Sequence, residues 1–424
     1  MIRPNPIWRS VAILGVAGLV LTACGDDGDT ASPKSSDSSS SKPAGAKGDG
    51  ELVVGTLLPQ TGSLAFLGPP EFAGVDLAAK KINDAGGVLG KPVRVIDSDS
   101  GDTTTSTASQ SVDRLLSSKV DTIVGAASSS VSLSVIDKIV GSGVLQISPA
   151  NTSITLTTYD DKGLYWRTAP PDLFQGRVLG DLALADGNST MGILALQDAY
   201  GTGLSDKTEE SFTAGGGEVV EKVIYDPKAA SFSTEVGKIK AADPEAIAII
   251  AFDEIFKIIP ELVKQGIGPA DKKIYLVDGD LKQFGKDLPP GTMTGAKGTT
   301  PGVLASEDFK KELLTIDPKL TDYSYAAESY DATVLVALAA EAAGDDSGES
   351  IASKMQDVSA GGEKCTDVAE CLTMLKDGKD IDYDGLSGPV EFNDAGDPSE
   401  AEMGIYEYGA DNMYKHVDAK KGKI

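Results

Sequence analysis

Short apolar runs alternate with amphipathic segments along residues 51–148. The run ELVVGTLLP at 51–59 is typical of a buried strand. Residues 71–87 instead carry apolar side chains at helical spacing and end in Gly86-Gly87, a common signal for a helix C-terminus. The same alternation predicts further strands at 91–100, 120–126 and 144–148, and further helices at 107–119 and 132–143. Repeated strand–helix alternation favours an α/β fold with a parallel sheet.

A second series of the same kind fills residues 191–280. Its apolar and amphipathic runs predict strands at 191–198, 218–226, 245–252 and 272–280, and helices at 203–217, 232–244 and 253–266. Between the two series, the segment YWRTAPPDLFQG contains Pro170 and Pro171, which suit a crossover between domains. The pattern therefore predicts two doubly wound lobes, in which small molecules bind beyond the carboxyl ends of the strands.

The first 50 residues differ in composition from the rest of the chain. Residues 1–23, with Arg3 and Arg9 before an apolar run that is short for a membrane span, are typical of a signal peptide. The sequence Leu-Thr-Ala-Cys24 resembles the lipobox of bacterial lipoproteins, which implies cleavage before Cys24 and a lipid on its thiol. An ordinary signal peptide with an incidental cysteine is the alternative. Residues 24–50 have almost no large apolar side chains, so we expect a lipidated cysteine followed by a disordered tether.

The charge of the chain limits its partners. The sequence has 38 basic and 64 acidic residues and a net charge of −26, and loss of the predicted leader would remove two of the basic ones. Nucleic acids and anionic lipid surfaces require basic patches, so neither is an expected partner. Contact with a membrane is expected through the lipid anchor alone.

Two cysteines remain after Cys24. In an exported chain, Cys365 and Cys371 are expected to form a local disulfide. A zinc site is the weaker alternative, because two cysteines and the single histidine, His416, make a poor set of ligands. We expect His416 at the surface, and no metal or cofactor.

Several segments, in order along the chain, carry a resemblance to a known family. They include the opening LLPQTGSLAFLGPPEFAGVDLAAKKINDAGGVLGKPVRVIDSDS, then IVGAASSSVS, ISPANTSITLT, LQDAYGTG and YDGLSGPVEFNDAGDP. Together they resemble the leucine/isoleucine/valine-binding protein family, the type I periplasmic solute-binding proteins of ABC importers. The resemblance implies two α/β lobes joined by three crossovers, near 169–171, 300–301 and 399–403. It also implies closure about a hinge, for which periplasmic binding proteins are a standard example.

The expected lobes are discontinuous in sequence. The first would comprise 51–169 and 302–400, and the second 170–301 and 401–424.

The resemblance places a ligand carboxylate in the first lobe, on Ser129 of GAASSS and on Ala150, Asn151 and Thr152 of SPANTS. Free N–H groups and hydroxyls that follow strands can satisfy a carboxylate. Helix caps and polar turns are the alternative explanation for these residues. Asn151 stands where the leucine-type binders have Ala.

The resemblance assigns other parts of the ligand to further residues. Tyr200 is expected to cover the ligand from the second lobe, and Phe252 to supply a second aromatic ring. An acid is expected to bind the ligand ammonium, at Asp278 or alternatively at Asp280; a solvated turn is the other explanation. Selectivity for the ligand side chain is expected from the remaining candidates, Phe66, Leu67 and Tyr325. Packing at the lobe edges would also explain these three.

Nothing in the sequence indicates an enzyme. A catalytic triad needs a histidine in the cleft, and His416 lies near the C-terminus. The GTG at 201–203 lacks the spacing of a phosphate-binding loop. We therefore expect an extracytoplasmic, lipid-anchored, monomeric protein that binds a neutral amino acid, with branched-chain ligands favoured, and docks on an ABC permease. A surface sensor of the same fold is the alternative function, and amides, urea or aromatic carboxylates are the alternative ligands.

Overall fold

The computed structural model describes residues 47–302 and 304–424, which belong to one unit of the chain. The predicted signal peptide, the lipidation site at Cys24 and all but the last four residues of the predicted tether lie outside the described residues. Within these residues, no helix has the length and apolar character needed to cross a membrane.

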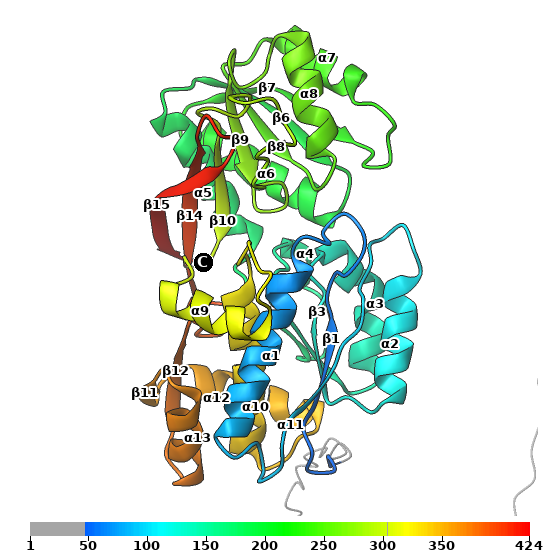
Figure 1. Cartoon of the computed structure of the whole chain (residues 1–424), viewed down its shortest axis with the longest axis vertical. Helices are drawn as coiled ribbons and strands as arrows, with labels where there is room; N and C mark the ends of the chain where they lie inside the picture. The colour runs from blue at the N-terminus through cyan, green and yellow to red at the C-terminus, as the bar shows by residue number, and fades with distance from the viewer. Residues whose placement is uncertain (1–46, 303) are drawn as a thin grey trace, which may run out of the picture. The chain divides into compact units, whose positions relative to one another are not determined.

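A five-stranded parallel sheet forms the first of two lobes (Figure 1). Its strand order is β2-β1-β3-β4-β5. The strands are β1 (Val53–Leu57), β2 (Arg94–Ile96), β3 (Thr122–Gly125), β4 (Leu145–Ser148) and β5 (Tyr165–Arg167). The helices between them are α1 (Gly68–Asp84), α2 (Thr107–Ser117), α3 (Ser129–Gly141) and α4 (Ile154–Thr157). Because strand order reverses beside β1, the sheet is doubly wound, and separate apolar clusters form with α1 and with α2 and α3.

Residues far along the chain complete the first lobe. The helix α10 (Ala326–Ala343) packs against α1 and is buried along most of its length, which fits a sequence that is apolar around the whole helix. Four shorter helices accompany it: α9 (Glu307–Ile316), α11 (Gly348–Ala352), α12 (Met355–Ser359) and α13 (Val368–Lys376). A small sheet holds β11 (Glu363–Cys365), β12 (Ile381–Gly385) and β13 (Gly388–Pro389). The predicted disulfide joins Cys365 to Cys371.

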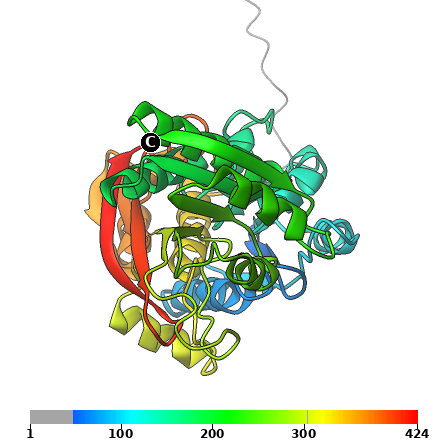
Figure 2. The ribbon, with the colours of Figure 1, turned by 90° about the horizontal axis from the view of Figure 1, so that it is seen from above.

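A seven-stranded sheet forms the second lobe, in the order β15-β14-β10-β9-β8-β6-β7. The parallel strands are β6 (Thr190–Leu196), β7 (Glu218–Tyr225), β8 (Ala246–Ile250), β9 (Lys273–Val277) and β10 (Lys297–Pro301). The antiparallel strands β14 (Glu400–Tyr408) and β15 (Tyr414–Lys423) lie along one side, in red in Figure 2. The helices are α5 (Asp172–Ala185), α6 (Ala199–Ala214), α7 (Ser233–Ala242) and α8 (Ile255–Gln265). Every residue of β8 is buried, as expected of a parallel strand covered on both faces.

The chain passes between the lobes three times (Figure 1). It crosses after β5, after β10 and between β13 and β14. This arrangement confirms the predicted architecture of two doubly wound α/β lobes joined by three crossovers.

Three predicted helices begin three or four residues earlier than expected: α1 begins at Gly68, and the other two begin beside the candidate site. The helix expected at 132–143 begins at Ser129, because Ser128 is its N-cap and accepts a hydrogen bond from the Val131 N–H. The helix expected at 203–217 begins at Ala199, where the Asp198 carboxylate accepts from the Gly201 N–H. Both caps satisfy N–H groups that the first turn leaves free. The consequence is that two helix N-termini lie next to the candidate site.

The disulfide is expected to add stability, because it closes a loop in the unfolded chain. Cys365 and Cys371 are six residues apart and both buried. Replacing both by Ala should lower the free energy of unfolding by about 2 kcal/mol, the chain-entropy value for so short a loop. Urea unfolding followed by circular dichroism measures this difference. Equal stability of the double variant and the parent chain would show that the disulfide adds nothing.

Candidate functional site

The loop after β4 and the start of α3 meet at the hydroxyl of Ser129. The Ser129 Oγ accepts hydrogen bonds from the N–H groups of Thr152 (3.3 Å) and Ser153 (3.2 Å). The two predicted polar segments, SSS and SPANTS, are therefore adjacent in the fold. Two N–H donors of SPANTS converge on the Ser129 hydroxyl oxygen, and converging N–H groups are what a small anion would need.

Asn151 has a different position from its neighbours. It is fully buried, and its Nδ2 donates to the carbonyl oxygens of Ala126 and Ala127, each at 2.8 Å. Its Oδ1 accepts from the hydroxyl of Tyr165 at 2.9 Å. The Asn151 amide thus ties the loop after β4 to the loop after β3, and it does not line the cavity described below. Its predicted contact with a ligand stays a prediction.

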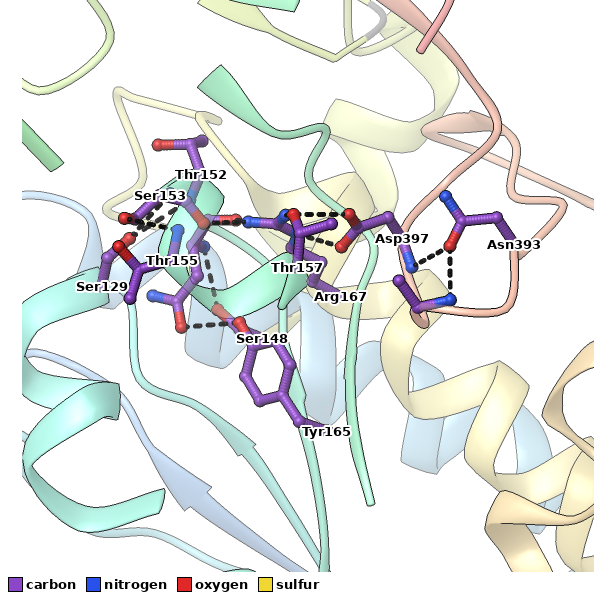
Figure 3. Close-up of polar contacts among 12 residues, drawn as sticks. Ser129, Ser148, Thr152, Ser153, Thr155, Thr157, Tyr165, Arg167, Asn393 and Asp397 are labelled. Atoms are coloured by element: carbon purple, nitrogen blue, oxygen red, sulfur yellow. Dashed lines mark hydrogen bonds and ion pairs between the residues drawn. The ribbon is translucent and has the colours of Figure 1, made fainter. Parts of the chain in front are cut away.

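A buried ion pair supports this loop from behind (Figure 3). Arg167, at the end of β5, donates from Nε to the Asp397 carboxylate at 2.6 Å, and both side chains are almost fully buried. Its Nη1 donates to the carbonyl oxygens of Asn151 (3.2 Å) and Ser153 (2.9 Å). Thr157 links Arg167 Nη2 (2.7 Å) to the second Asp397 oxygen (2.8 Å). Arg167 thus binds the carbonyl groups of the residues before and after Thr152. Because the Asn151 carbonyl belongs to the same peptide group as the Thr152 N–H, this contact fixes the direction of that N–H.

Asp278, just after β9, is the acid that faces the cavity from the second lobe. Its carboxylate accepts from the hydroxyls of Tyr200 and Tyr325, each at 2.7 Å, and from Gln175 Nε2 at 2.8 Å. Burial raises the pKa of Asp278, while the hydrogen bonds from Tyr325, Tyr200 and Gln175 act in the opposite direction. The carboxylate therefore has a rigid set of donors and no cation within its hydrogen-bonded shell among the described residues.

The other predicted acid has a structural contact instead. Asp280 is fully buried and accepts from the N–H groups of Val277 (2.8 Å) and Ala251 (3.1 Å), which joins the ends of β8 and β9. It does not line the cavity, so the structure favours Asp278 for the role that the sequence left open between them.

Some of the aromatic and apolar candidates line the cavity and one does not. The Phe252 ring stacks on the Tyr200 ring with centroids 5.5 Å apart, and both line the cavity. Leu67 and Tyr325 line it as well. Phe66 lies under the Lys282 ammonium, 4.2 Å from the ring centroid, and is not part of the lining. Its predicted part in selectivity remains untested.

The cavity lies between the lobes. Its volume is about 20 Å³, enough for about one water molecule. Its lining includes eight of the eleven candidate residues: Leu67, Ser129, Ala150, Thr152, Tyr200, Phe252, Asp278 and Tyr325. A second cavity of about 250 Å³ shares Leu64, Ser128 and Phe252 with it. An amino acid would need the lobes to separate before it could enter.

Two serines beside the cavity hold the lobes together. Ser130 Oγ donates to the Asp198 carboxylate (3.0 Å) and accepts from the Ala199 N–H (3.1 Å). Ser153 Oγ donates to the Ala199 carbonyl at 2.9 Å. The N-terminus of α6 therefore contacts both polar segments of the first lobe, directly next to Tyr200.

Three residues of this arrangement, Arg167, Gln175 and Asp397, are not identified by the sequence reasoning. Arg167 and Gln175 both lie in the segment YWRTAPPDLFQG, to which the sequence assigns only a crossover. The charged Arg167 at the end of a buried strand was the available signal, because a buried arginine requires an acid. Its partner Asp397 lies 230 residues away, and no local pattern identifies such a pair.

Known proteins similar to this chain have the two-lobed fold described above or belong to families of binding proteins. The sequence matches the family described as periplasmic binding protein over residues 51–407. It is similar to the chemotactic signal transduction system substrate-binding protein BasB of Halobacterium salinarum, with 27% identity over 363 residues, 82% of this chain and 84% of that protein. It is also similar to the Leu/Ile/Val-binding protein BraC3 of Rhizobium johnstonii, with 26% identity over 375 residues, 85% of this chain and 92% of the relative.

Solved structures share the fold at lower sequence identity. The branched-chain amino acid transporter substrate-binding protein LivJ of Streptococcus pneumoniae, in complex with isoleucine, has a TM-score of 0.72 and 22% identity, over 88% of this chain and 100% of that one. A solute-binding protein of an ABC transporter from R. palustris, in complex with 4-hydroxybenzoate, has a TM-score of 0.71 and 17% identity, over 88% and 98% of the two chains.

The buried pair should be far more important for stability than an exposed one. Arg167→Met would leave the Asp397 carboxylate buried without its cation, which should lower the free energy of unfolding by about 3–5 kcal/mol. Lys80→Met is the matched control, since Lys80 pairs with Asp84 on an exposed helix face and should cost no more than about 0.5 kcal/mol. Urea unfolding of both variants tests this. A loss for Arg167→Met no larger than that for Lys80→Met would contradict the role given to the pair.

Proposed function

The chain belongs to the periplasmic binding protein family, and we propose that it captures an amino acid between its two lobes and delivers it to an ABC permease. The ligand is a neutral α-amino acid, with a branched side chain favoured. One observation carries this proposal: donors on one lobe and an acid on the other face the same cavity. An α-amino acid presents the complementary pair, a carboxylate and an ammonium.

The first lobe supplies the carboxylate end. The Thr152 N–H and Ser129 Oγ already lie within hydrogen-bond distance of each other, and both residues line the cavity with Ala150. A ligand carboxylate would accept from the Thr152 N–H in place of the Ser129 hydroxyl oxygen. Neutral donors hold an anion without a permanent counter-charge, so the ligand can leave when the lobes open.

The second lobe supplies the ammonium end. Asp278 is the acid of the cavity lining, and two tyrosines and Gln175 fix its position. A ligand ammonium would compensate a carboxylate that burial otherwise makes costly to ionise. This acid favours an amino acid over a simple aromatic carboxylate, which has no cation to offer it.

The rest of the lining favours a neutral, apolar side chain. Leu64, Leu67 and the Phe252 ring are apolar members of the lining, and Leu64 and Phe252 also border the larger cavity. Apolar walls add affinity in proportion to the surface that they remove from water. Among the structural neighbours, LivJ is described in complex with isoleucine and the R. palustris protein with 4-hydroxybenzoate. The acid at 278 is our reason for preferring the first class of ligand.

A sensor of the same fold is the second candidate function. The relative BasB is described as part of a chemotactic signal transduction system, which supports this alternative. Ligand capture would be identical in the two cases, and only the docking partner would differ. Stimulation of a reconstituted permease by the liganded protein would favour transport.

We also propose a lipid anchor on Cys24 and a monomeric state, which mass spectrometry of the membrane-bound protein and light scattering would test.

A ligand screen tests the proposed function directly. Calorimetry of the purified protein against amino acids, amides, urea and aromatic acids should give the tightest binding for a neutral amino acid. Binding of an aromatic carboxylate but of no amino acid would contradict the amino-acid proposal while leaving a solute-binding role in place.

The role of Asp278 can be tested by class of ligand. Asp278→Asn should weaken binding of an amino acid by roughly 10- to 100-fold, the range for a lost hydrogen bond to a charged group. Binding of the corresponding carboxylic acid without the amine should change little. Asp287→Asn, at an exposed acid of the second lobe, is the matched control and should leave both affinities unaltered. Equal losses for the two ligands in Asp278→Asn would show that Asp278 does not bind the ammonium.

A further inference from the structure

A separate cavity of about 310 Å³ lies beside the second crossover between the lobes. Its lining combines residues of the second crossover with strands β14 and β15 and with the segment before α10. The ionisable side chains of its lining are Lys310, Asp322, Tyr323, Tyr325, Glu328, Tyr406, Tyr414 and His416. We call it the hinge cavity. Of these residues, only Tyr325 also lines the cavity between the lobes.

Glu328 is the central acid of the hinge cavity. The residue is buried, with only 3% of its surface exposed. Among the described residues, no other side chain donates to its carboxylate and no cation pairs with it, although it lines the cavity. A buried carboxylate normally pairs with a cation or with several donors. This one borders a space large enough for a small molecule.

The charges around the hinge cavity leave it acidic. Asp322 is a second acid of the lining, and it accepts from the Ser324 N–H at 2.7 Å. Lys310 is the lysine of the lining, but its Nζ is bound to Glu307 at 2.8 Å. The lining therefore holds two acids, Glu328 and Asp322, against one lysine, whose ammonium is also paired with Glu307.

Aromatic rings form much of the remaining wall. The Tyr406 ring is packed edge to face against Tyr414, with centroids 5.2 Å apart, and against His416 at 5.4 Å. The Lys310 ammonium lies 5.6 Å from the centroid of the Tyr323 ring, so this ring already has a cation beside it, and Tyr325, Tyr406 and Tyr414 are the other tyrosines of the lining. Tyrosine faces attract alkylammonium groups, and a carboxylate among them strengthens the preference for a cation.

We propose that the hinge cavity binds a small organic cation, with its ammonium on Glu328 and its alkyl groups against the tyrosine rings. The alternative is a water-filled gap that only accommodates motion of the crossovers. Burial, with a contribution from Asp331, raises the pKa of Glu328 to about 8. Glu71 on α1 is a further buried acid nearby, since Glu328 contributes to its raised pKa. A bound cation would offset this accumulation of buried acids.

The position of Glu328 couples the hinge cavity to the lobes. The Thr168 hydroxyl of the first crossover donates to the Glu328 carbonyl at 2.9 Å. At the second crossover, a side-chain carbon added at Gly302 would overlap the Glu328 carboxylate. Tyr406 lies on β14, after the third crossover, and Glu328 contributes to its raised pKa. Glu328 thus contacts the first crossover and lies against the second, so a ligand on it would bias the lobe equilibrium by its difference in affinity for the two states.

Tyr325 provides the link to the proposed amino-acid site. It lines the hinge cavity, and its hydroxyl donates to Asp278 at 2.7 Å. We therefore expect occupancy of the hinge cavity to change the affinity for an amino acid between the lobes, and the reverse. This coupling rests on the proposed function, whereas the cation site does not.

Calorimetry with tetramethylammonium chloride tests the site, with sodium chloride as the control for ionic strength. At about pH 8.5, above the Glu328 pKa, we expect saturable binding with a dissociation constant on the order of 1–10 mM. Glu328→Gln should weaken it by about tenfold or more, because the amide keeps the shape of the acid and removes its charge. Glu349→Gln, at an exposed acid, should leave it unaltered.

Four results would overturn parts of the proposal. An equal response to sodium chloride, or an unchanged affinity in Glu328→Gln, would refute the cation site. Retention of tetramethylammonium binding in Asp278→Asn, in which amino-acid binding should be weakened, would show that the hinge cavity is independent of the site between the lobes; loss of it there would refute a separate site. An amino-acid affinity that saturating tetramethylammonium does not alter would refute the coupling.

Discussion

The buried pair of Arg167 and Asp397 connects the parts of the molecule that must keep their relative positions. Arg167 ends the last strand of the first sheet, just before the chain crosses to the second lobe, and Asp397 lies just before the chain crosses for the third time. The same guanidinium holds the carbonyl groups of Asn151 and Ser153. Charges this deeply buried are tolerated only when their hydrogen-bonding capacity is met, so the pair requires one arrangement of loop and crossovers.

The buried acids near the cavity between the lobes, unlike Asp397, have no cation as a partner among the described residues. Asp278 has three neutral donors, and burial raises the pKa of Asp172 beside it well above the ordinary range. Each of these groups would be easier to ionise with a cation nearby. The acids of the second lobe would thus be stabilised by a positive charge in the cavity between the lobes. The N–H and hydroxyl donors of the first lobe would be satisfied by a negative charge there. The proposed zwitterionic ligand would satisfy both.

The sequence was sufficient for the architecture and for most of the cavity lining. Strand–helix alternation predicted the doubly wound lobes, and the resemblance of short segments placed Ser129, Tyr200 and Asp278 at one site. It did not separate Asn151 from Ala150 and Thr152, because neighbouring residues in a loop point in different directions and only the fold decides which one faces a cavity. It could not pair Arg167 with Asp397 or assign Gln175 to Asp278, since those contacts span 230 and 103 residues. The hinge cavity was equally hidden, because segments that are distant in sequence form its lining.

The central claim is that a zwitterionic ligand spans the two lobes in one orientation. A crystal structure grown with the tightest-binding amino acid tests it most directly. We expect the ligand carboxylate within hydrogen-bond distance of the Thr152 N–H and Ser129 Oγ, and its ammonium on the Asp278 carboxylate. A ligand bound in the reverse orientation, or one whose ammonium has no contact with Asp278, would contradict the account.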